Sequence, residues 1–302
     1  MRRVALPLAL ALAAAACVAP PAATPAGPGG AAVARPAPAP APAGPPAAAG
    51  PSTFLFAGEL TQGGWIRGQV PAGTVSAALG DKPLTFSSDG QFFAAFDRDA
   101  GPAAMLVATL RDGRTVQAPL AIAPRAWQIE HINASPTADV PSAEFIARRQ
   151  PELQRIAAAR ERMTGSQGWR EKFIWPARGR VSGLFGSQRI YRGAPGSYHS
   201  GIDIAGGSGT EYVAPADGVV VLAAEAPFTL EGNLLIIDHG MGLSSAFLHS
   251  SALLVHEGES VRQGQVIGRI GMTGRATGPH LHWGLVWRGA RLDPLLFTGP
   301  MG

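Results

Sequence analysis

Six of the seven histidines in this 302-residue chain lie within one stretch of 84 residues, 199–282. Within it, His199 and Asp203 are four residues apart, and His280 and His282 are separated by a single residue. Side chains alternate along an extended strand, so two imidazoles at this spacing project from the same face. Zinc binds nitrogen, sulfur or carboxylate ligands in a tetrahedron, and a hydrolytic site leaves one position for water. The pattern therefore predicts a metal site that activates water.

Three sequence motifs in this stretch occur together in one known family. They are H-S-G-I-D at 199–203, S-A-F-L-H at 245–249 and T-G-P-H-L-H-W at 277–283. In type, order and approximate spacing they resemble the signatures of the LytM and lysostaphin-type zinc metallopeptidases. The resemblance covers residues 173–297 and leaves the first half of the chain unexplained.

This resemblance implies a role for each of five side chains. It makes His199, Asp203 and His282 the zinc ligands, and His249 and His280 the catalytic pair. Zinc polarises a scissile carbonyl and lowers the pKa of water. The two histidines would deprotonate that water, stabilise the oxyanion and return a proton to the leaving amine, and either could be the general base. Activity is expected to fall in mild acid, because the histidines take up protons and metal is lost.

The other histidines of the chain are expected to be structural or exposed. His239 follows an apolar strand, His256 precedes a turn signal, and His131 lies outside the motif region. Trp283 alternates with His282 along the same strand, so it is expected to pack in the core.

Two departures from the family pattern concern the substrate subsites. Gly284 occupies a position at which members of the family often have an acidic residue. Residues 189–197 are expected to form an inserted loop before the first motif. Arg189, Arg192 and Tyr198 are candidates to contact an anionic stem peptide. A loop that covers the groove is an equal alternative.

The first 51 residues are typical of targeting and spacer sequence. Arg2 and Arg3 precede a short apolar run, the layout of a signal peptide over 1–16. Cys17 is the only cysteine, and its acylation, which would supply a membrane tether, and ordinary cleavage are equal alternatives. Residues 17–51 contain 30 Ala, Pro or Gly among 35 positions and predict an extended linker.

The formal net charge of +4 overstates the basic character of the part that folds. Beyond residue 51, positive and negative side chains nearly balance, and Lys and Arg occur in runs no longer than two. A phosphate-tracking surface needs a clustered basic face, so a nucleic-acid partner is excluded.

The segment 52–126 alternates short β-prone runs with turn signals and predicts a small β-sandwich. Asp89-Gly90 and Asp112-Gly113 are dipeptides typical of tight hairpins. No cluster of titratable residues occurs here, so a binding, spacing or gating role is expected, and the sequence does not choose among these. The expected strands are 54–60, 65–70, 74–79, 92–96, 105–110 and 115–122.

A helical connector is expected over 127–169, where apolar residues recur with a helical period between 142 and 163. Pro151 is expected to split it into two shorter helices. The segment 170–302 is expected to form an antiparallel β-sheet metallopeptidase domain with a groove over the sheet. The fold class is therefore mainly β.

Together these features predict an exported zinc endopeptidase that hydrolyses the peptide cross-links of peptidoglycan. The resemblance favours bonds between D-alanine and meso-diaminopimelate, in the periplasm or at the outer membrane of a Gram-negative envelope. The expected partners are peptidoglycan stem peptides and a regulatory envelope protein. The alternative is a catalytically silent LytM-like regulator that binds and activates a cell-wall amidase.

Overall fold

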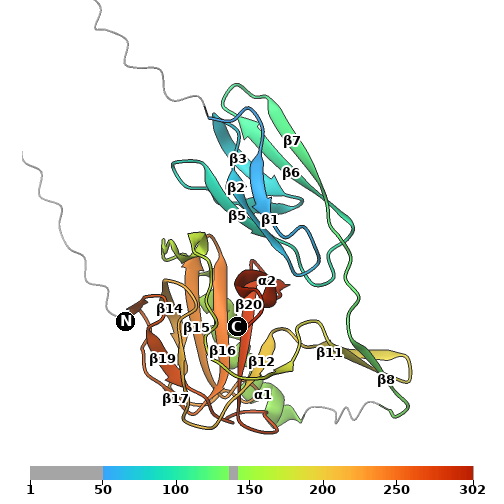
Figure 1. Cartoon of the computed structure of the whole chain (residues 1–302), viewed down its shortest axis with the longest axis vertical. Coiled ribbons are helices and arrows are strands. Elements are labelled where there is room, and N and C mark those ends of the chain that lie inside the picture. Colours follow the sequence, from blue (N-terminus) through green and yellow to red (C-terminus); the bar gives the residue numbers. More distant parts are fainter. Residues whose placement is uncertain (1–49, 136–141, 302) are drawn as a thin grey trace, which may run out of the picture. The chain divides into compact units, whose positions relative to one another are not determined.

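The computed structural model describes residues 50–135 and 142–301 (Figure 1). The predicted signal peptide, Cys17 and nearly all of the linker lie outside the described residues. Within those residues the chain is mainly β, with antiparallel sheets and two α-helices, which confirms the predicted fold class. Neither helix is both long and apolar enough to span a bilayer.

Seven strands between residues 55 and 121 form two antiparallel sheets, which pack around buried aromatic and aliphatic side chains such as Phe92 and Leu106. Six of the strands lie where they were expected, and β4 is an additional one. Gly90 and Gly113 adopt positive φ values of 78° and 85°, as the two hairpin signals require. One sheet contains β1 (Leu55–Gly58), β2 (Trp65–Gln69) and β5 (Gln91–Ala95), and the other β4 (Lys82–Leu84), β3 (Thr74–Leu79), β6 (Ala103–Leu110) and β7 (Thr115–Ala121).

The C-terminal half is built on an eight-stranded antiparallel sheet (Figure 1). Its order is β18 (Ser260–Val261), β14 (Gly218–Ala223), β15 (Asn233–Gly240), β16 (Leu243–Ser250), β20 (His280–Trp287), β12 (Ile202–Ala205) and β9 (Val181–Gly183), with β21 (Ala290–Leu292) also paired to β20. A small sheet of β13 (Glu211–Val213), β19 (Val266–Arg269) and β17 (Ala252–Leu253) accompanies it.

Strand β20 shows how the alternation of side chains separates site from core. Leu281, Trp283 and Leu285 are fully buried and belong to the main hydrophobic cluster. His280 and His282 therefore project from the opposite face. The expected core position of Trp283 is confirmed.

The structure corrects the expectation that Pro151 splits the connecting helix. Helix α1 (Ala143–Glu161) is continuous, with Ser142 capping its first turn and Pro151 inside it. Proline removes one helical hydrogen bond, but tertiary contacts hold α1 on both sides of this position. Arg149 forms an ion pair with Glu231, and Ile156 packs against apolar side chains of β14 and β15.

The connector also contains a strand that the helical pattern did not predict. Strand β8 (Ile129–Ile132) pairs in parallel with β10 (Gln188–Tyr191), and β10 pairs with β11 (Ala194–Tyr198). The expected inserted loop is therefore a β-hairpin in a three-stranded sheet. Arg189 of this hairpin forms an ion pair of 2.8 Å with Glu130 of β8.

Two short helical turns complete the fold, η1 (Gly168–Arg170) and α2 (Leu295–Thr298). The loop before α2 carries Asp293, which is fully buried and forms an ion pair of 2.7 Å with Arg125. The Trp65 indole of β2 donates to the Leu296 carbonyl of α2 at 3.0 Å. These contacts join the N-terminal sheets to the end of the chain.

His239 of β15 is a buried structural histidine, as expected. Its Nδ1 donates to the Asp217 carbonyl at 2.8 Å, so Nε2 accepts a hydrogen bond from the Ser245 hydroxyl at 2.7 Å. Burial lowers the pKa of His239 to about 4, since the surrounding core disfavours the charged ring. The neutral form is the one that the fold accommodates.

Folding stability is therefore expected to fall as the pH drops from about 6.5 toward 4. In this window His239 takes up a proton in the unfolded chain but stays neutral in the folded one. The free energy of unfolding therefore falls by about 1.4 kcal/mol per pH unit. Denaturant unfolding of chelator-treated protein should show a shallower pH slope for His239→Gln than for wild type. The exposed histidine variant His256→Gln is the control and should keep the wild-type slope; an unchanged slope in His239→Gln would contradict the assignment.

Candidate metal centre

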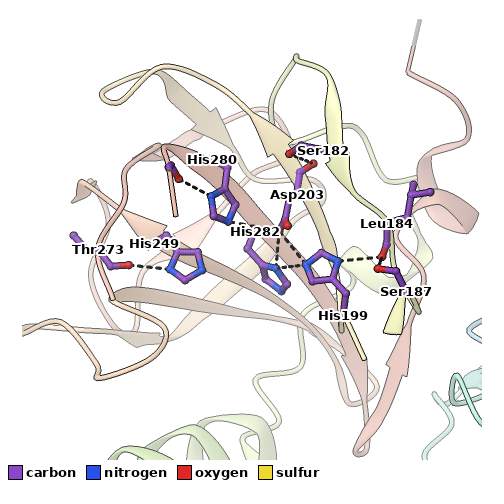
Figure 2. A network of polar contacts seen from close by, with 10 residues as sticks. Ser182, Leu184, Ser187, His199, Asp203, His249, Thr273, His280 and His282 are labelled. Atoms are coloured by element: carbon purple, nitrogen blue, oxygen red, sulfur yellow. Dashed lines mark hydrogen bonds and ion pairs between the residues drawn. The ribbon is translucent and has the colours of Figure 1, made fainter. Parts of the chain in front are cut away.

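Three of the predicted site residues meet where β12 and β20 pair. The register places Asp203 directly opposite His282, and His199 lies just before β12. Asp203 Oδ1 lies 3.0 Å from His199 Nε2 and 2.9 Å from His282 Nδ1 (Figure 2). The two ring nitrogens are 3.0 Å apart. His199 and His282 are 4 and 79 positions from Asp203 in the sequence, yet the three side chains lie together.

The donor set of this cluster fits zinc. It offers two imidazole nitrogens and one carboxylate oxygen, the ligand types of hydrolytic zinc sites. A tetrahedron with bonds of about 2.0–2.1 Å puts neighbouring ligand atoms about 3.3 Å apart, and the three observed separations are slightly shorter. That zinc binds here stays a prediction, and the convergence of these atoms supports it.

Electrostatics keeps the carboxylate of this cluster ionised. Burial alone would raise the pKa of Asp203, but hydrogen bonds from His199 and His282 hold it well below its usual range. Burial lowers the pKa of His282, which favours the neutral ring that a metal requires. For His199, burial acts in the same direction, but the contact with Asp203 outweighs it and raises the pKa.

Backbone carbonyls determine which ring nitrogen each histidine presents. His199 Nδ1 donates to the Leu184 carbonyl at 3.1 Å, so Nε2, which faces Asp203, is the atom that would bind a metal. His249 Nδ1 donates to the Thr273 carbonyl, and His280 Nδ1 to the Gly278 carbonyl, each at 2.8 Å (Figure 2). The Nε2 atoms of His249 and His280 are therefore proton acceptors when the rings are neutral.

The predicted catalytic pair lies beside the three-residue cluster. The rings of His249 and His280 have centroids 5.0 Å apart, and His280 Nε2 is 3.7 Å from Asp203 Oδ1. Burial lowers the pKa of His249, and the positive charge of neighbouring histidines acts in the same direction. His249 also has a φ of +64°, a conformation that costs a non-glycine residue of order 1 kcal/mol.

All five predicted side chains thus lie together, in a groove of ≈ 370 Å³. Arg275, Thr277 and Glu231 also line the groove, and Glu231 is ion-paired with Arg149 of α1. His239, His256 and His131 do not line it, in agreement with the sequence analysis.

Sequence reasoning missed the backbone that orients these side chains. No residue-type signal marks a carbonyl, so the roles of Leu184, Thr273 and Gly278 follow only from the fold. The motif glycine has a visible reason: a Cβ at Gly201 would lie 2.4 Å from the Trp283 carbonyl oxygen and 2.8 Å from His282 Nε2. At Gly183, a Cβ would lie 2.4 Å from Asp203 Oδ2.

Comparison with known proteins agrees with this geometry. Residues 197–294 match the model of Peptidase family M23. These residues form a family M23 domain. A peptidase M23 from Pseudomonas aeruginosa, known from a crystal structure, has a TM-score of 0.61 and 25% sequence identity, with 80% of this chain and 96% of that chain covered.

Relatives of the M23 domain include proteins of two kinds. It is 40% identical over 126 residues to the peptidoglycan DD-endopeptidase ShyA of Vibrio cholerae, covering 40% of this chain and 28% of ShyA. It is 37% identical over 123 residues to the murein hydrolase activator NlpD of Escherichia coli, covering 41% of this chain and 30% of NlpD. The similarity thus spans less than a third of either relative.

Metal affinity is expected to depend on the absence of a side chain at the motif glycine. The change Gly201→Ala would push the new Cβ against His282 and the Trp283 carbonyl, so we expect zinc affinity to fall about 10- to 100-fold. Competition with a chromogenic chelator measures this. Gly207→Ala is the matched control, because its Cβ meets only Thr210 Oγ1 at 3.6 Å; equal affinities in the two variants would contradict the steric argument.

Proposed function

We propose that the protein is a zinc-dependent endopeptidase that hydrolyses peptide cross-links of peptidoglycan. The observation that carries this proposal is the convergence of three ligand-type side chains and two backbone-oriented histidines in one groove. When bound, zinc would polarise the scissile carbonyl and make water a stronger nucleophile at neutral pH. The ligands in this proposal are His199, Asp203 and His282.

The remaining two histidines would handle the protons of the reaction. His249 and His280 each present a bare Nε2 to the groove, because a backbone carbonyl engages Nδ1. One Nε2 would take the proton of the attacking water and the other would donate to the oxyanion or leaving amine. The lowered pKa of His249 keeps its ring neutral in mild acid, which suits the general base.

The substrate follows from the kind of relatives that the M23 domain has. Three relatives in Vibrio cholerae are named peptidoglycan DD-endopeptidases. We therefore assign hydrolysis of the bond between D-alanine and meso-diaminopimelate, carried out by an exported protein in the periplasm or at the outer membrane. The predicted signal peptide and the acylation of Cys17 belong to this proposal.

A regulator that activates a separate amidase is the second candidate, since the domain is also 37% identical to a murein hydrolase activator. In that case the protein would bind a regulatory envelope partner rather than cleave peptide bonds. The presence of all five site residues in productive orientations favours the enzyme.

Cleavage should require both the metal and the histidine pair. Zinc-loaded protein, residues 48–302, is expected to convert cross-linked muropeptide dimers to monomers, read by mass spectrometry, and a chelator should stop the reaction. His249→Ala should keep its zinc and lose about 100- to 10,000-fold in kcat. His282→Ala should lose both zinc and activity.

His256→Ala is the control for this series, because that side chain is 84% exposed and lies outside the groove. If the zinc-loaded wild type leaves dimers intact but stimulates a cell-wall amidase, the regulator is correct and the enzyme is wrong.

The rate should also fall on the acid side of the pH profile. Neutral His249 is required, and its pKa lies below the ordinary value, so the acid limb of kcat/KM is expected below about pH 6.5. Metal content measured at each pH separates protonation from metal loss. Activity that stays constant down to about pH 4 would contradict a histidine base.

A further inference from the structure

A second cavity, of ≈ 180 Å³, adjoins the groove between α1 and the sheet. Ser200, Glu231, Leu248 and His282 line both spaces, so the cavity is a side pocket of the groove. Its other lining side chains come from α1, β15, β16, β20 and β21. Nothing in the mechanism above uses it.

Positive charge dominates this side pocket. Three arginines, Arg149, Arg160 and Arg291, line it against one carboxylate, Glu231. Glu231 is ion-paired with Arg149, which donates to both of its carboxylate oxygens at 2.6 Å. Within the described part of the chain, neither Arg160 nor Arg291 forms an ion pair with a carboxylate.

The two unmatched guanidiniums act on one another. The pKa of Arg160 is lowered, first by desolvation of its guanidinium and then by the positive charge of Arg291, and the charge of Glu231 acts in the opposite direction. Both residues are exposed, so a ligand can reach them. Arg291 is held in place by its strand and by the ring of Tyr198, 5.3 Å from its guanidinium. An anion between the two cations would relieve their repulsion.

The rest of the pocket selects a small organic anion. Ile156, Ala246 and Val286 give it an apolar wall. Gly284 is two residues from His282 on the same face of β20 and has no side chain, so it supplies no carboxylate to the pocket. A carboxylate accepts two parallel hydrogen bonds from a guanidinium, which suits arginine better than any other cation.

We propose that Arg160 and Arg291 bind a substrate carboxylate located one carbon from the scissile nitrogen. This inference rests on the proposed function. In a D-alanyl-meso-diaminopimelate cross-link, the carbon that bears the scissile nitrogen also bears a free carboxylate. His282, a proposed metal ligand, lines the same pocket as the two arginines, so the pocket begins beside the proposed metal. A glycine bridge has no such group, and an amidated diaminopimelate has lost its charge.

The test compares two cross-linked dimers that differ only in this group, the free carboxylate and its amide. Wild-type protein should show a KM roughly tenfold or more lower for the carboxylate, with similar kcat, since a charge-assisted hydrogen bond is lost with the amide. Arg160→Gln and Arg291→Gln should erase this preference by raising the KM of the carboxylate substrate. Arg160→Lys should retain part of it.

Arg148→Gln is the matched control, because Arg148 lies on α1 but does not line the pocket, and it should keep the wild-type preference. Arg275→Gln is the second comparison, because Arg275 lines the groove but not the side pocket. Equal KM values for the two dimers in wild type would overturn the proposal, as would a preference that survives in Arg160→Gln and disappears in Arg275→Gln.

A binding measurement separates this proposal from the proposed function. Metal-free protein is titrated by calorimetry with N-acetyl-D-alanyl-D-alanine and with its C-terminal amide. If no dimer is cleaved but the carboxylate binds more tightly than the amide, and Arg160→Gln removes the difference, the carboxylate-binding pocket is supported and the endopeptidase proposal is wrong. If dimers are cleaved but the two ligands bind equally, the endopeptidase is supported and the proposed pocket is wrong.

Discussion

The antiparallel register between β12 and β20 is the constraint on which the rest of the site depends. It sets Asp203 opposite His282, and cross-strand neighbours have Cβ atoms about 5 Å apart, close enough to share a ligand. A slip of one residue would turn His282 into the core and bring Trp283 to the groove. The fully buried Trp283, Leu281 and Leu285 therefore fix the position of the proposed metal ligands from the opposite face of the sheet.

This register also explains why the glycines near the site are restricted. The close approach of the His199 loop to β20 leaves no room for a Cβ at Gly201, and the pairing of β9 with β12 leaves none at Gly183. Backbone atoms thus lie against both Asp203 and His282, two of the proposed ligands.

Sequence patterns predicted which side chains lie together in the groove but not what surrounds them. The spacing of His280 and His282 predicts a shared strand face, and the structure shows it, because side-chain alternation is a local rule. The carbonyls of Leu184 and Thr273 carry no residue-type signal. The continuity of helix α1 escaped prediction for a different reason: the propensity of Pro151 is local, whereas the contacts that hold the helix come from residues about 80 positions away, such as Glu231.

Helix α1 consequently supports the groove and lines its side pocket, rather than acting only as a connector. Arg149 engages Glu231, which lines both the groove and the side pocket, and Glu152 accepts from Thr229 in the same loop. Ile156 and Ala159 cover Leu234 and Ile236 of the sheet. A fragment beginning at residue 170 would expose that apolar surface and leave Glu231 without its arginine. The structural unit that positions the proposed catalytic residues therefore begins before the M23 match, at the start of this helix.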